Sequence, residues 1–73
     1  MINSKTVFEL ISKDKLNLIK IAKSVKVDFE GVLGFYIVFD RLPIKEALLK
    51  ISDDIVEEFK DKEELWNEII KDL

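Results

Sequence analysis

The stretch Val32–Phe39 constrains the fold of this chain more than any other segment. It consists of eight uncharged residues, VLGFYIVF, in a chain of which 37% of the residues are charged. β-Branched and aromatic side chains dominate it. An apolar run of this size is costly to leave in water, so it has to be buried within the fold or covered by a partner. Its placement therefore decides both the architecture and where another molecule can bind.

The composition excludes several kinds of functional site. The chain has 73 residues, which predicts a single small domain over residues 1–73 with a modest core. It contains neither cysteine nor histidine, which removes disulfides, the commonest metal ligands, the usual general base and the thiol nucleophile. A domain of this size also has little room for a concave substrate site. We therefore expect a protein that is not an enzyme, with no catalytic residue, no cofactor and no metal site.

The chain has no segment of the kind that targets or spans membranes. No run approaches the ~20 apolar residues that cross a bilayer. The N-terminal sequence MINSKTVFELI lacks the basic start and long apolar core of a signal peptide. These features predict a cytoplasmic protein that does not use the membrane as a partner.

Charge is distributed unequally along the chain. Residues 1–41 carry seven basic and five acidic groups, whereas residues 42–73 carry five basic and ten acidic groups. Eleven of the twelve basic residues are lysine, while planar recognition of phosphate and guanine relies mainly on arginine. The pattern argues against nucleic acid as a partner and favours attraction of the C-terminal half to a basic protein surface.

The N-terminal block has the pattern of a helical segment. Thr6 and Glu9 have the spacing of a capping box, and Asp14 is placed to cap a second helix. Apolar residues recur behind both positions at helical spacing. We therefore expect the chain to begin with helical structure that extends to about residue 24.

The C-terminal block predicts two helices. Pro43 suits a first helical turn, and a stripe follows at spacings of 4, 3, 4 and 4 residues: Ile44, Leu48, Ile51, Ile55 and Phe59. The polar sequence at residues 52–54 predicts a kink or a division in this helix. Asp61 followed by Glu64 predicts the start of the last helix.

The middle block has the alternation of a β-hairpin. Val25, Val27 and Phe29 alternate with charged residues, and a loop at residues 30–32 would place them opposite apolar residues of the following run. Glycines also cost less in a hairpin than in a helix interior. We therefore predict a mostly helical α+β fold: an N-terminal helical segment, a β-hairpin at about residues 24–39, and two C-terminal helices that cover its apolar face.

The same residues also fit an all-α small bundle with a helix-turn-helix-like core. Their spacing resembles the general helix-turn-helix motif, with Ala22 at the helix contact, Asp28 as the cap of the second helix, and Val32 and Phe35 facing inward. Residues 28–42 would then form a central buried helix. The motif usually has glycine where this chain has Lys26.

The helix-turn-helix alternative implies a DNA-binding transcriptional regulator. Four lysines would contact phosphates: Lys15, Lys20, Lys23 and Lys26. The second helix would offer glycine and apolar side chains that cannot read base edges, and Glu30 would face phosphates. These residues make DNA binding the weaker of the two functional hypotheses.

We favour a non-enzymatic protein–protein interaction module, a regulator or inhibitor that binds a partner with a basic surface, with a homodimer as the alternative assembly. Apolar side chains would anchor the partner, and the acidic C-terminal helices would steer it. For the single tryptophan, a place as a lid on the core is the other interpretation. The candidate partner-binding residues are Tyr36, Val38, Trp66, Glu57, Glu58, Asp61 and Glu64.

Overall fold

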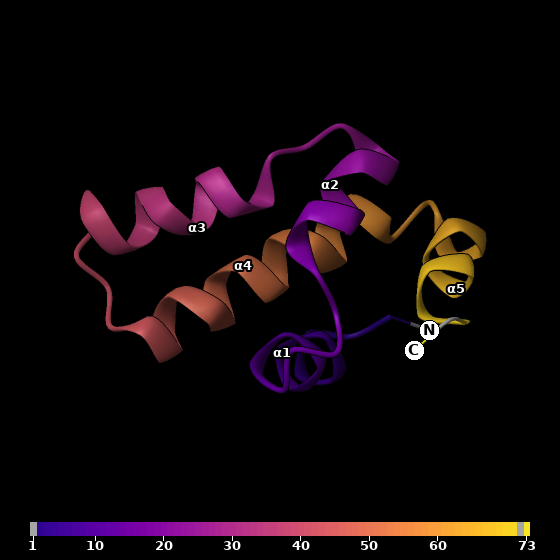
Figure 1. The fold of residues 1–73 in the computed structure, drawn as a ribbon, viewed down its shortest axis with the longest axis horizontal. Helices are drawn as coiled ribbons and strands as arrows, with labels where there is room; N and C mark the ends of the chain where they lie inside the picture. The colour runs from indigo at the N-terminus through magenta and orange to yellow at the C-terminus, as the bar shows by residue number, and fades with distance from the viewer. Residues whose placement is uncertain (1, 72) are drawn as a thin grey trace.

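The computed structural model describes residues 2–71 and 73, and all regular structure within them is helical (Figure 1). The helices are α1 (Ser4–Ser12), α2 (Leu18–Val25), α3 (Phe29–Val38), α4 (Ile44–Phe59) and α5 (Glu63–Lys71). The β-hairpin predicted for residues 24–39 is therefore wrong, and so is the α+β class. The all-α alternative fits the structure.

The middle block is helical because its local signals favour a helix–turn–helix over a hairpin. Lys26 adopts the left-handed conformation, with φ 58°, and ends α2. Two residues later Asp28 caps α3, since its carboxylate accepts a hydrogen bond from the Gly31 backbone N–H at 3.0 Å. Val25 and Val27 consequently lie at a helix end and in the turn. Their period-two alternation reflects a weak β preference that tertiary packing overrides.

The helix-turn-helix interpretation is right about Asp28 and wrong about how deeply α3 is buried. The helix ends at Val38, and Phe29 is its only buried residue among those described. Val32 is half-buried, whereas Phe35 is exposed instead of facing inward. Residues 28–42 are therefore not a central buried helix.

The N-terminal helices are capped by asparagines, not by the residues that the sequence suggested. Asn3 caps α1 by accepting a hydrogen bond from the Thr6 N–H at 2.9 Å. Asn17 caps α2 by accepting from the Ile19 N–H at 2.8 Å. Asp14 lies in the connecting loop with φ 56°. The predicted caps at Thr6 and Asp14 are wrong, because a well-placed asparagine competes equally for the first backbone donors.

The long helix α4 is continuous over all sixteen of its residues. Ser52 does not divide it, because its buried hydroxyl donates to the Leu48 carbonyl at 2.7 Å and is satisfied within the helix. Pro43 immediately precedes the first helical residue. One face of α4 supplies the centre of the core: Ala47, Ile51, Ile55 and Phe59.

The last helix folds back so that its tryptophan closes the core. Helix α5 begins at Glu63, and the Trp66 N–H donates to the Lys62 carbonyl at 3.0 Å, so Lys62 takes the capping position predicted for Asp61. The Trp66 ring packs against Phe59 with the ring centroids 5.4 Å apart.

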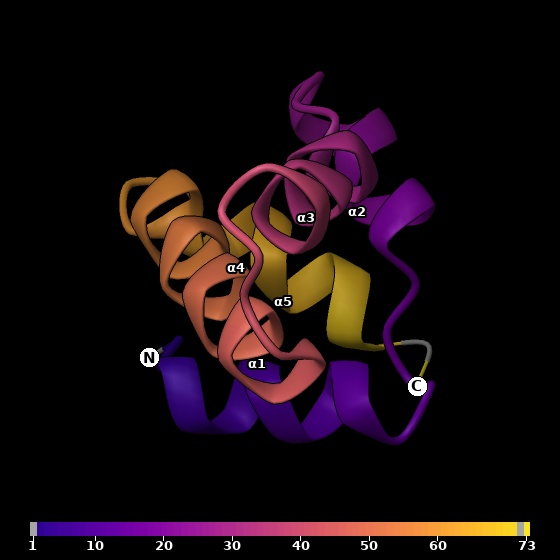
Figure 2. The same ribbon diagram turned by 90° about the vertical axis from the view of Figure 1, so that its left-hand side faces the viewer.

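The pair of helices α3 and α4 projects from the rest of the molecule. Helix α4 contacts α1, α3 and α5, while α2 contacts α3. Figure 1 shows α3 and α4 running side by side as an antiparallel hairpin, whose connecting loop points away from α5. In the end-on view of Figure 2, α1 crosses beneath α4 and α3 lies above it. Within the described part of the chain, no helix therefore covers the outward side of α3.

Candidate protein-interaction surface

Helix α3 is apolar on all sides yet is covered on only one. Its sequence is FEGVLGFYIV, and Glu30 is its only charged residue. A helix that is apolar all round normally lies in the interior of a protein. Here it lies at the edge of the molecule, with α2 and α4 as its neighbours (Figures 1 and 2).

The exposed side chains gather at the C-terminal end of α3 and the start of α4. We call this set the apolar tip; its members are Phe35, Val38, Phe39 and Ile44, which are 51%, 66%, 71% and 61% exposed. The spacing of three and four residues puts the first three on one side of the chain. The two phenylalanine rings stack with their centroids 4.9 Å apart.

The size of the apolar tip is that of a functional patch. Its four side chains expose about 400 Å² of apolar surface, taking ~200 Å² for a whole aromatic side chain and ~150 Å² for Val or Ile. The largest apolar patch on a typical monomer measures about 300–600 Å² and often binds a partner. The apolar tip is therefore a candidate contact surface.

Polar contacts hold α3 against α4 directly behind the apolar tip. The Tyr36 hydroxyl donates a hydrogen bond to the Asp54 carboxylate. The Lys50 ammonium lies 4.5 Å from the centre of the Tyr36 ring and 3.6 Å from the Asp40 carboxylate in the α3–α4 loop. The hydrogen bond to Asp54 raises the pKa of Tyr36 to about 12, with smaller contributions from burial and from the charges of Asp54 and Asp40. Tyr36 thus links α3 to α4.

The structure brings three of the seven predicted partner-binding residues together. Tyr36, Glu57 and Glu58 line a hollow of about 300 Å³ between α3 and α4, together with Asp54. The glutamates are partly neutralised, because Glu57 pairs with Lys60 at 2.7 Å and Glu58 with Lys62 at 3.2 Å. Acidic groups therefore border α3 on the side that faces α4.

The other four predicted residues lie in separate places. Val38 belongs to the apolar tip. Asp61 and Glu64 line a shallow hollow at the turn between α4 and α5. Trp66 is 4% exposed and belongs to the core, which agrees with the alternative interpretation of this residue as a lid on the core. We therefore do not count Trp66 among the residues of the candidate surface.

Sequence reasoning missed three members of the apolar tip. The helix-turn-helix alternative had Phe35 facing inward, and the helical stripe put Ile44 in the core, while Phe39 was not singled out. A helical projection of residues 29–39 would have revealed the signal, because apolar residues then occupy the outward side as well as the inward side.

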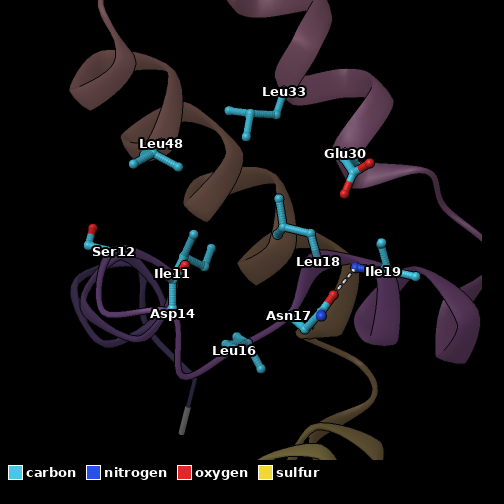
Figure 3. Close-up of a pocket in the computed structure, with 10 residues that line it drawn as sticks. All are labelled: Ile11, Ser12, Asp14, Leu16, Asn17, Leu18, Ile19, Glu30, Leu33 and Leu48. Carbon is cyan, nitrogen blue, oxygen red and sulfur yellow. Dashed lines mark hydrogen bonds between the residues drawn. The ribbon is translucent and has the colours of Figure 1, made fainter.

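A second and larger hollow lies on the other side of α3. It has a volume of about 580 Å³ and lies between the α1–α2 connection, α2, α3 and α4. Figure 3 shows Leu16, Leu18, Leu33 and Leu48 around it, with Asn17 turned to its capping bond with the Ile19 N–H. Its polar side chains are not arranged as a nucleophile beside a base. The hollow is open to solvent, and its walls are mainly apolar side chains and not groups placed for catalysis.

Two further observations bear on the kind of site. Among the described residues, no three acidic side chains are grouped in a way that would hold a metal ion. Within the same part of the chain, no helix is both long enough and apolar enough to cross a bilayer.

Comparison with known proteins adds no assignment: no family model, no curated protein and no solved structure matches this chain. The functional interpretation therefore depends on the surface that α3 presents.

Proposed function

We propose that this protein is a non-enzymatic protein–protein interaction module, a regulator or inhibitor, that binds its partner through α3. The observation that supports the proposal is an all-round apolar helix whose outward side is uncovered. Covering such a surface removes apolar area from water and is the main source of affinity at protein interfaces. The aromatic pair in the apolar tip is of the residue type that dominates binding energy.

The charges beside α3 indicate the partner's chemistry. Asp54, Glu57 and Glu58 line the hollow between α3 and α4, so a complementary surface would be apolar where it meets the apolar tip and basic beside that hollow. Such pairing at the rim mainly accelerates association and weakens as salt rises.

A photo-crosslinking experiment tests the proposal in cells that naturally produce the protein. A benzophenone amino acid replaces Val38 in the apolar tip, and in a matched control it replaces Lys5, which is exposed on α1. We expect a covalent adduct with a protein from position 38 and none from position 5. Identical adduct patterns at the two positions, or no protein adduct at position 38, would contradict the proposal.

DNA binding is the second candidate, and one observation favours it. Helix α2, the turn at residues 26–28 and α3 have the order of a helix-turn-helix, with Asp28 as the cap. The outward side of α3 argues against it, because Gly31, Gly34 and Val38 offer no donor or acceptor to a base edge. A gel shift with bulk duplex DNA at low salt tests this hypothesis. A complex that dissociates as salt rises supports DNA binding, and the absence of a complex at low salt excludes it.

A further inference from the structure

We infer that α2 and α3 open together, as one unit, away from α1, α4 and α5 and without global unfolding. We call α2 and α3 the hinged pair. A hydrogen bond from Tyr36 of α3 to Asp54 of α4 holds it closed. This opening goes beyond the proposed function, because it follows from the packing of the helices and requires no partner.

The buried core lies mainly outside the hinged pair. Figures 1 and 2 show α2 and α3 on one side of α4 and α1 on the opposite side. Helices α1 and α5 pack on α4, whereas α2 packs mainly on α3. Helices α2 and α3 each have one buried side chain, Ile21 and Phe29, while α4 has five. Segments with few buried contacts open at a lower free energy than the core, and α2 should follow α3 because most of its contacts are with α3.

Packing between α3 and α4 is incomplete on both sides of α3. The hollow of about 580 Å³ lies along one side and reaches Leu33 of α3 and Leu48 of α4. The hollow of about 300 Å³ lies along the other side, where Val32 and Glu57 are among the residues that line it. Side chains that border an unfilled space lack part of their dispersion contacts. The junction of α3 with α4 is therefore weaker than a fully packed one.

Both connections to the hinged pair contain a residue in the left-handed conformation. Asp14 lies between α1 and α2 with φ 56°, and Arg41 lies between α3 and α4 with φ 53°. Residues other than glycine adopt this conformation at an energetic cost, and opening allows both residues to leave it. Hinges are a few loop residues that absorb a change in backbone angles. Asp14 and Arg41 lie where the hinges are required.

The polar contact at Tyr36 acts as a latch across the junction. The Tyr36 side chain is half-buried, and its hydroxyl donates to a charged carboxylate, which makes a stronger hydrogen bond than a neutral acceptor does. An analogous contact lies on the other side of α4, where the Ser4 hydroxyl of α1 donates to Asp53. The first bond crosses the junction that opens. The second lies between helices that stay together.

Opening exposes the inward side of α3, and this consequence alone rests on the proposed function. A partner that contacts the inward side as well as the outward side binds only the open form. Its apparent affinity is then reduced by the fraction of molecules that are open. The Tyr36 latch would thereby regulate binding.

Native-state hydrogen exchange of the purified protein, followed by NMR for individual amides, tests the opening. The most protected amides of α2 and α3 should share one opening free energy. They should exchange at least about tenfold faster than the most protected amides of α4, after correction for intrinsic rates. Urea should accelerate their exchange less steeply, because the opening exposes less surface than global unfolding does. Equal protection in α3 and α4, or separate opening of α2 and α3, overturns the inference.

The two hydroxyl contacts of α4 provide matched variants. Tyr36→Phe removes a hydrogen bond that is lost both in the open form and in global unfolding, so exchange should rise about fivefold in α2, α3 and α4 alike. Ser4→Ala removes a hydrogen bond that persists in the open form, so only α4 should exchange faster, by about twofold. Val7→Ala, at a fully buried position of α1, should accelerate α4 by at least about tenfold and the hinged pair by less.

Circular dichroism verifies that each variant stays helical. A Tyr36→Phe variant with unchanged exchange in α2 and α3 overturns the latch. A Val7→Ala variant that accelerates α2 and α3 as much as α4 overturns the independent opening of the hinged pair. None of these measurements requires a partner, so crosslinking at position 38 tests the proposed function separately.

Discussion

Two glycine-to-alanine substitutions in α3 test whether this segment is a helix or an extended strand. Gly34→Ala places a methyl group in open space, and alanine is favoured over glycine in a helix interior by ~0.5–1 kcal/mol. Gly31→Ala puts its Cβ against a carboxylate oxygen of Asp28, the residue that caps the helix through the Gly31 N–H. The carboxylate must move, and losing a cap costs ~1 kcal/mol, so the helix gain is cancelled.

The expected magnitudes are measurable in a protein of this size. Gly34→Ala should raise the free energy of unfolding by ~0.5–1 kcal/mol, which corresponds to a melting temperature about 2–8 °C higher. Gly31→Ala should be about 1 kcal/mol less stable than Gly34→Ala. Both are compared in the Val38→Lys background, so that association does not contribute to stability. Equal stabilities, or a Gly34→Ala variant less stable than its parent, would refute the helical account of this segment.

Three further outcomes follow from the packing, the titration and the caps. Phe59→Ala removes a fully buried ring and should cost ~3–5 kcal/mol in urea unfolding, whereas Phe39→Ala in the apolar tip should cost less than ~1 kcal/mol; similar losses would contradict the assigned burial. Tyr36, the single tyrosine, should titrate in ultraviolet absorbance near pH 12, and Asp54→Asn should move its pKa towards the ordinary 10.0. Because folding raises this pKa, the contribution to stability is complete below pH 10.0 and is lost as pH rises through about 12; an unchanged titration in Asp54→Asn would exclude the hydrogen bond as the cause. Asn17→Ala should lower the free energy of unfolding by ~1 kcal/mol through loss of the α2 cap, and no change would refute that role.

The outer parts of the fold were predictable from sequence because their signals agree with one another. The apolar stripe of α4 has helical spacing, a proline just before it and charged residues between, and Ile51, Ile55 and Phe59 of that stripe are buried. Its first member, Ile44, lies beyond the end of the core and is exposed. Periodicity identifies the face of a helix, but it does not tell how far along that face the core extends.

The middle block was not predictable because two templates fit it and the wrong one fits the side-chain types better. β-Branched and aromatic residues favour strands, and the alternation from Val25 to Phe29 reinforces that preference. The deciding features are small: a left-handed Lys26 that ends one helix, and an Asp28 carboxylate that starts the next. Both depend on the backbone conformation, so residue types alone do not reveal them.

The exposed apolar surface was predictable in kind but not in detail. The apolar run at residues 32–39 requires cover from the fold or from a partner, and Val38, one of the predicted partner-binding residues of this run, is exposed. Tyr36 and Val38 share a face in a strand, whereas in a helix they lie on different sides. Because this segment is a helix and not the predicted strand, the exposed aromatic side chains are Phe35 and Phe39 instead of Tyr36.

The most direct test of the central claim measures whether α3 is covered in the cell. The chain contains no cysteine, so Val38→Cys and Asn67→Cys each provide a single thiol at an exposed position, one on α3 and one on α5. In dilute purified protein a membrane-permeant maleimide should label both thiols at similar rates. In intact cells we expect Cys at position 38 to be labelled at least about tenfold more slowly than Cys at position 67, because a partner covers α3. Equal labelling of the two thiols in cells would show that α3 remains open to water and would contradict the proposal that it is an interaction surface.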